Sequence, residues 1–95
     1  MKNKAKAAAK IRSALDGLNE VLVKNDMAVL SVSSSAQILK FIQLFDVALK
    51  NINSDDIPPK SNRELGIARV IVDQWPFDIE LGEVIIEAEQ AYKSI

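Results

Sequence analysis

The stretch NKAKAAAKIRSALDGLNEVLV, residues 3–23, decides the fold class of this chain. Its apolar side chains recur at intervals of three and four residues, which is the spacing that lines one face of an α-helix. The residues on this face are Ala8, Ile11, Leu15, Leu18 and Leu22. The turn signal Lys24-Asn25-Asp26 follows directly, so we expect one continuous helix that ends at about Val23.

A second long helix is expected to begin at Ser34, because Ser34-Ser35-Ala36-Gln37 fits a capping box. In this motif the serine hydroxyl accepts a hydrogen bond from the backbone N–H three residues on, and the glutamine side chain reaches back. The segment from Met27 to Ser33 fits either a helix or a loop, with a break before Ser34. The periodicity after the cap predicts a buried face made of Leu39, Ile42, Phe45, Ala48 and Leu49.

The last part of the chain predicts a loop followed by two more helices. The pairs Asp55-Asp56 and Pro58-Pro59 cannot continue a helix, so we expect a loop over residues 53–59. A second capping box, Ser61-Asn62-Arg63-Glu64, predicts the next helix start, and Pro76 predicts its end. The inward positions of this helix would be Leu65, Ala68, Ile71 or Val72, and Trp75.

Asp78 is expected to cap the final helix, because aspartate is a preferred N-cap residue. The apolar face of this helix would contain Leu81, Val84, Ile85, Ala88 and Tyr92. Gly17, Gly66 and Gly82 fall inside the helical patterns, and we expect them to permit close packing between the protein's own helices or with a partner. The 95 residues therefore predict one all-α domain over residues 1–95, a compact bundle of four to five antiparallel helices.

Composition excludes most catalytic chemistry. The chain has no cysteine and no histidine, which removes disulfides, zinc fingers, thiol nucleophiles and imidazole bases. It has no Gly-x-Ser-x-Gly elbow, and its three scattered glycines cannot form a phosphate-binding loop. Glu80, Glu83 and Glu87 follow one helix face, but opposite the apolar stripe, where solvated carboxylates suit binding better than proton transfer. We therefore expect a protein that is not an enzyme and uses neither a cofactor nor a metal.

The charges are unevenly distributed, although the net charge is only −1. The first fifteen residues contain five bases and no acid. Lys2, Lys6 and Lys10 stack at four-residue spacing, and a DNA-associated regulator could lay such a row along the phosphates. The acids gather in the last third, where they predict either a solvated face or a patch that binds a positively charged surface. Trp75, beside this patch, is expected either in the core or as an interface anchor.

No apolar run approaches the roughly eighteen residues of a membrane span, and the start lacks the apolar region of a secretory signal. We therefore expect no membrane association and a cytoplasmic location. The basic, acid-free start is also typical of an organellar transit peptide. The same apolar stripe continues past Asp16 and Glu20, however, which favours a structural helix.

Several short motifs occur in an order that matches a known family. They are Leu30-Ser31, the run Ala36-Gln37-Ile38-Leu39-Lys40-Phe41-Ile42, Ser54-Asp55-Asp56, Leu65-Gly66-Ile67-Ala68-Arg69, Asp78 with Glu80-Leu81, and Ala88. From Leu30 to Tyr92 the chain thereby resembles a family of small bacterial immunity proteins that neutralise NAD(P)+ glycohydrolase toxins delivered by type VI secretion. It departs from the family at Asp73, which stands one position later than the usual glutamate of the glycine helix.

The resemblance implies a non-enzymatic antitoxin that binds a cognate toxin in the cytosol and occludes its active site. We expect a monomer or weak homodimer that binds no nucleic acid. The alternative is a small helical adaptor or DNA-associated regulator that uses the basic first helix. The expected partner-binding residues are Asp73, Asp78, Glu80, Glu83, Glu87 and Gln37.

Overall fold

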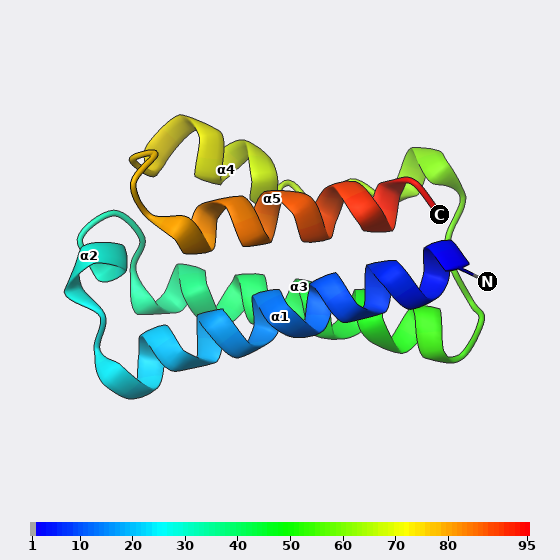
Figure 1. Ribbon diagram of the computed structural model, residues 1–95, viewed down its shortest axis with the longest axis horizontal. Helices are drawn as coiled ribbons and strands as arrows, with labels where there is room; N and C mark the ends of the chain where they lie inside the picture. Colours follow the sequence, from blue (N-terminus) through cyan, green and yellow to red (C-terminus); the bar gives the residue numbers. More distant parts are fainter. Residues whose placement is uncertain (1) are drawn as a thin grey trace.

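A computed structural model describes the backbone of residues 2–95 and the side chains of residues 3–95. Within these residues the chain is all-α and contains no strand, as predicted (Figure 1). Three long helices, α1 (Lys2–Lys24), α3 (Ser35–Asn53) and α5 (Glu80–Lys93), form the body of the bundle. The shorter elements are α2 (Met27–Leu30), a 3-10 turn at Lys60–Asn62 and α4 (Ile67–Gln74). The open question about residues 27–33 is thus resolved as a single helical turn followed by a bend.

Helix α1 is the centre of the bundle, since it packs against both α3 and α5 while α4 packs on α5 (Figure 1). Its buried side chains are Ala7, Ala8, Ile11, Ala14, Leu18 and Val21. Leu15 and Leu22, predicted for the same face, lie half-buried at its edge. The alanines on this face are short, so the neighbouring helices can approach the α1 backbone closely.

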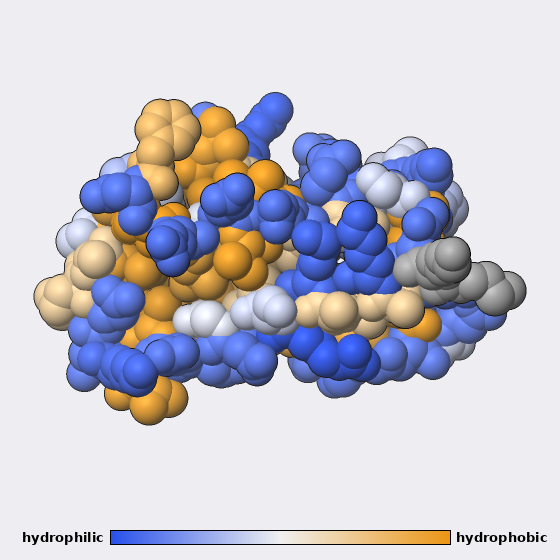
Figure 2. Space-filling view, in the orientation of Figure 1, coloured by the Kyte–Doolittle hydropathy of each residue, from blue (hydrophilic) through white to orange (hydrophobic). Residues whose placement is uncertain are grey.

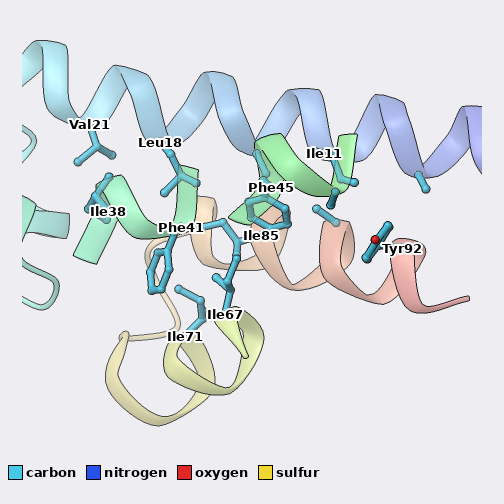
Figure 3. Packing of buried hydrophobic residues seen from close by; sticks show 14 of the residues in the cluster. Ile11, Leu18, Val21, Ile38, Phe41, Phe45, Ile67, Ile71, Ile85 and Tyr92 are labelled. Atoms are coloured by element: carbon cyan, nitrogen blue, oxygen red, sulfur yellow. The ribbon is translucent and has the colours of Figure 1, made fainter. Parts of the chain in front are cut away.

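The core is one continuous cluster that draws on every long helix (Figure 3). Ile11, Phe45, Ile85 and Tyr92 meet where α1, α3 and α5 come together. Ile67 and Ile71 extend the cluster into α4, beside Phe41 of α3 (Figure 3). The described residues therefore share one hydrophobic core.

The N-cap prediction for α3 is confirmed, but the predicted buried face is partly wrong. Ser34 Oγ accepts a hydrogen bond from the backbone N–H of Gln37 at 3.1 Å. Leu39, predicted to be buried, is 50% exposed. The helix instead buries Ile38, Phe41, Phe45, Ala48 and Ile52. Both rows have helical spacing, and the core takes the row that carries two phenylalanines because it removes more apolar surface from water.

The predicted helix start at Ser61 is wrong. Residues 60–62 form only a 3-10 turn, and α4 begins at Ile67, directly after Gly66. Gly66 has a φ of 80°, a left-handed conformation that glycine adopts without steric cost. This residue therefore lies at the entry to the helix, outside the helical pattern in which it was predicted, and it breaks any helix begun further upstream.

The predicted end of α4 is confirmed, but the predicted start of α5 is wrong. Pro76 does end α4, because the residue before a proline is held in extended conformation and Trp75 has φ −94° and ψ 138°. The predicted N-cap at Asp78 is wrong: Ile79 occupies that position, and no side chain caps the helix there. Residues 76–79 form a turn in which the Ile79 N–H donates to the Pro76 carbonyl at 3.3 Å, so Asp78 lies inside this turn, one residue before the capping position.

Candidate interaction surface

A groove of about 370 Å³ lies between α4 and the first two turns of α5. Its floor is apolar, and its rim carries two carboxylates. The lining residues are Ile71, Val72, Trp75, Pro76, Phe77, Ile79, Gly82, Glu83, Ile86 and Glu87. This volume falls in the range of about 300–1,000 Å³ that is typical of binding pockets.

Close packing of the two helices forms the floor of the groove. Gly82 is buried in α5, and a Cβ atom added to it would meet Ile71 Cγ2 at 3.0 Å and Trp75 Cε3 at 3.4 Å. The prediction that Gly82 packs tightly against the protein's own helices is therefore confirmed. A glycine at this position lets α4 lie directly against the α5 backbone.

Trp75 forms one wall of the groove and belongs to the core. Its side chain is 6% exposed, and its indole N–H donates a hydrogen bond to Ser33 Oγ at 2.8 Å. Ser33 is itself 3% exposed, and this bond joins the α4 end to the bend after α2. Of the two alternatives predicted for Trp75, core residue or interface anchor, the structure confirms the core. The indole gives the groove a rigid wall.

Apolar side chains on this part of the molecule face solvent. Phe77, in the turn between α4 and α5, is 105% exposed, and Val72 on α4 is 65% exposed. Figure 2 shows an apolar area over α4 and the start of α5, bordered by hydrophilic residues. The rest of the face in that view is predominantly hydrophilic. An aromatic side chain placed wholly in water next to an apolar groove is typical of a protein-binding surface.

The five predicted acids all lie on the exposed surface, but only two of them line the groove. Glu83 and Glu87 form its acidic rim. Asp73 on α4, Asp78 in the turn and Glu80 at the start of α5 are exposed on the same segments without lining it. No lysine or arginine occurs among the lining residues within the described chain. The groove therefore presents negative charge around an apolar floor.

Gln37 is not part of this surface. It lies half-buried on the first turn of α3 and does not line the groove. Ser34 caps its backbone N–H, but no hydrogen bond from the Gln37 side chain back to Ser34 forms among the described residues, so only the serine half of the predicted capping box is present.

The basic and acidic ends of the sequence lie against each other in space. Lys10 Nζ of α1 approaches Glu87 Oε2 of α5 at 3.3 Å. Lys4 pairs in the same manner with Asp55 of the loop after α3. Of the predicted row Lys2, Lys6 and Lys10, the charge of Lys10 is therefore partly compensated by an acid of this chain. Lys6 stays exposed, and the side chain of Lys2 lies outside the described residues. Glu83 forms no ion pair among the described residues, so its charge is free for a partner.

One buried carboxylate was not predicted as a structural group. Glu89 on α5 is 3% exposed and accepts hydrogen bonds from the backbone N–H groups of Leu65, Gly66 and Ala68, at 2.9, 3.1 and 2.8 Å. These N–H groups lie in the first turn of α4 and in the two residues before it, and the negative charge also complements the helix dipole. Glu89 therefore positions α4 on α5. Only its alignment with the buried face of α5 could have identified it.

Nothing in the described residues resembles a metal centre, since no group of three or more acidic side chains is arranged to hold an ion. No helix among these residues is both long enough and apolar enough to cross a membrane. No protein-family model matches the chain, and no curated protein is significantly similar to it. The resemblance to immunity proteins therefore rests on the motifs quoted above.

Proposed function

We propose that this protein is a non-enzymatic immunity protein that binds a cognate NAD(P)+-degrading toxin and covers its active site. The observation that carries this proposal is the groove between α4 and α5, whose acidic rim and exposed Phe77 form a surface that none of the described residues covers. The motif order between Leu30 and Tyr92 supplies the class of partner.

The charge of the groove is complementary to the active site of such a toxin. An enzyme that binds a dinucleotide has to offer positive charge or backbone N–H donors to the phosphates. The rim carboxylates, chiefly that of Glu83, can bind the toxin groups that otherwise hold the phosphates, and in this way compete with the dinucleotide. Covering a cleft in this way requires no catalytic group. The toxin would consume cytosolic NAD(P)+, so the bacterial cytoplasm is where the antidote would act.

The apolar part of the surface accounts for the affinity that an antidote needs. Full burial of a phenylalanine such as Phe77 contributes about 1.5–3 kcal/mol to association. A few such anchors dominate most protein interfaces, and charged residues around them mainly raise the association rate and the specificity. Phe77 is expected to act as the anchor and the acids as the steering charges.

The proposal is tested by purifying this protein together with the product of the adjacent upstream gene, since immunity genes lie beside their toxin genes. The complex should be stable, and combined charge reversal by Glu80→Lys and Glu83→Lys should weaken it at least tenfold without loss of helicity. Asp56→Lys is the matched control, because Asp56 is an exposed acid in the loop at the opposite end of the bundle (Figure 1). Failure to form a complex would contradict the proposal. Steeply salt-dependent binding of duplex DNA would instead favour the regulator.

A further inference from the structure

The groove between α4 and α5 combines two recognition chemistries within one small volume. Its floor and one wall are made of apolar side chains such as Ile71, Ile86 and Trp75, and its rim holds Glu83 and Glu87. A ligand that satisfies both must carry an apolar group and a cation close together. We propose that this groove receives an apolar side chain flanked by an arginine or lysine on a protein partner. This inference rests on the proposed function, because it specifies the part of the toxin that the groove holds.

Charge determines which of the possible occupants fits. A second copy of this chain related by a two-fold axis would bring its own Asp73, Asp78 and Glu83 toward the same acids, and like charges across an interface cost several kcal/mol. A segment of opposite charge gains from the same arrangement. The groove therefore favours a basic partner over a homodimer.

The two rim carboxylates differ in how much charge they can offer. Lys10 lies 3.3 Å from Glu87, so the charge of Glu87 is partly compensated within the protein. Glu83 has no such neighbour among the ion pairs of the described residues. We assign the main cation contact to Glu83. Glu80 serves as the internal comparison, because it is an exposed acid on the same helix that does not line the groove.

Arginine suits this position better than lysine. Its planar guanidinium can donate two parallel hydrogen bonds to one carboxylate, and its aliphatic stem can cover apolar surface. The ring of Phe77, which is fully exposed at the edge of the groove, is available to stack on the guanidinium. A lysine ammonium would retain the charge contact and lose the bidentate geometry.

The test uses a small probe that contains only this chemistry, so it requires no toxin. 2-Phenylethylguanidinium joins an aromatic ring to a cation, and 3-phenylpropionate joins the same ring to an anion. Binding is followed by amide shifts in NMR spectra and by the fluorescence of Trp75, the single tryptophan. The cationic probe should bind with a millimolar Kd and shift amides of residues 71–87, and the anionic probe should bind at least fivefold more weakly.

Glu83→Gln should weaken binding of the cationic probe about fivefold, the effect of one exposed charge pair worth about 1 kcal/mol. Glu80→Gln should leave the affinity unchanged. Equal affinity for both probes, shifts outside the groove, or equal effects of the two variants would overturn the inference. So would a Phe77-dependent dimer in sedimentation experiments, which would make a second copy the occupant.

The same variants separate this inference from the proposed function. If the probe binds as described and the adjacent gene product does not, the groove assignment holds and the immunity function fails. If the toxin complex forms equally well with the Glu83→Gln and Val72→Ser variants, the immunity function holds and the groove is not its contact. Val72 is suited to this comparison because it lines the groove and is largely exposed, so its substitution spares the core.

Discussion

The carboxylate of Glu89 on α5 caps the start of α4 through the backbone N–H of Ala68, which donates to Glu89 Oε1 at 2.8 Å. The other carboxylate oxygen accepts from Leu65 and Gly66. One side chain therefore satisfies the Ala68 N–H in the first turn of α4, which has no partner within the helix, and two N–H groups just before the helix. Because α4 supplies one wall of the groove, the position of the binding surface depends on this contact.

Glu89→Gln should lower the free energy of unfolding by about 1.5–3 kcal/mol, because a neutral amide has a single acceptor oxygen and no charge. Glu80→Gln, at an exposed position, should change it by less than about 0.5 kcal/mol. Urea titrations of both variants measure the difference. Equal stability of the two variants would show that the buried carboxylate is not needed for the position of α4.

The three capping predictions can be compared directly by alanine substitution. Ser34→Ala should cost about 1 kcal/mol, since it removes the oxygen that accepts from the Gln37 N–H. Ser61→Ala and Asp78→Ala should each cost less than about 0.5 kcal/mol, because neither residue caps an α-helix among the described residues. Chemical denaturation measures all three. A loss at Ser61 or Asp78 as large as that at Ser34 would contradict the assigned helix starts.

Gly82→Ala should be destabilising although alanine is the better helix former. The new methyl group would meet Ile71 Cγ2 at 3.0 Å, and a β-branched side chain in a helix has little freedom to turn away. We expect a net loss of about 1 kcal/mol. Gly17→Ala is the matched substitution: it meets the flexible end of Leu81 and should be close to neutral. In an Ile71→Ala background the penalty at Gly82 should disappear, and its persistence there would exclude this contact as the cause.

Acid should weaken the contact between the N-terminal end of α1 and the loop after α3. A hydrogen bond from Lys4, together with its charge, lowers the pKa of Asp55 below the ordinary value of 3.8. The folded state therefore binds this proton less readily than the unfolded chain, so the pair stabilises above pH 4 and loses its contribution as the pH falls below that value. Because the Asp55 side chain is largely exposed, the effect should be small.

The measurement is the urea midpoint of unfolding between pH 6 and pH 2.5. Asp55→Asn should reduce the fall in the midpoint on the acid side, and asparagine tolerates the φ of 57° at this position. Asp56→Asn is the control, since Asp56 forms no ion pair among the described residues. Identical pH profiles for Asp55→Asn and the parent protein would show that the Lys4 contact has no effect on folding.

Local signals in the sequence predicted the long helices correctly, and contacts distant in sequence explain the errors. The Ser34 cap acts on a residue three positions away, so it can be read from the chain. The start of α4 depends on Glu89, more than twenty residues downstream, and on the left-handed Gly66, neither of which a local motif encodes. Similarly, α3 has apolar residues around much of its circumference, so periodicity alone could not choose between Leu39 and Ile38.

The candidate surface was predicted only in part. The acids of the last third were identified from their density, but the sequence could not separate Glu83 and Glu87, which line the groove, from Asp73, Asp78 and Glu80, which do not. That distinction depends on how α4 crosses α5 at Gly82. The exposure of Phe77 is likewise a property of the turn after Pro76, because an apolar residue next to a core tryptophan would ordinarily be assigned to the core.

Inhibition is the most direct test of the proposal that this protein silences an NAD(P)+-degrading toxin. The product of the adjacent upstream gene is incubated with NAD+ while the protein is added in increasing amounts. NAD+ loss should stop near one equivalent of the parent protein, and the Glu80→Lys/Glu83→Lys variant should require a large excess. NAD+ consumption that continues unchanged at excess parent protein would contradict the proposal.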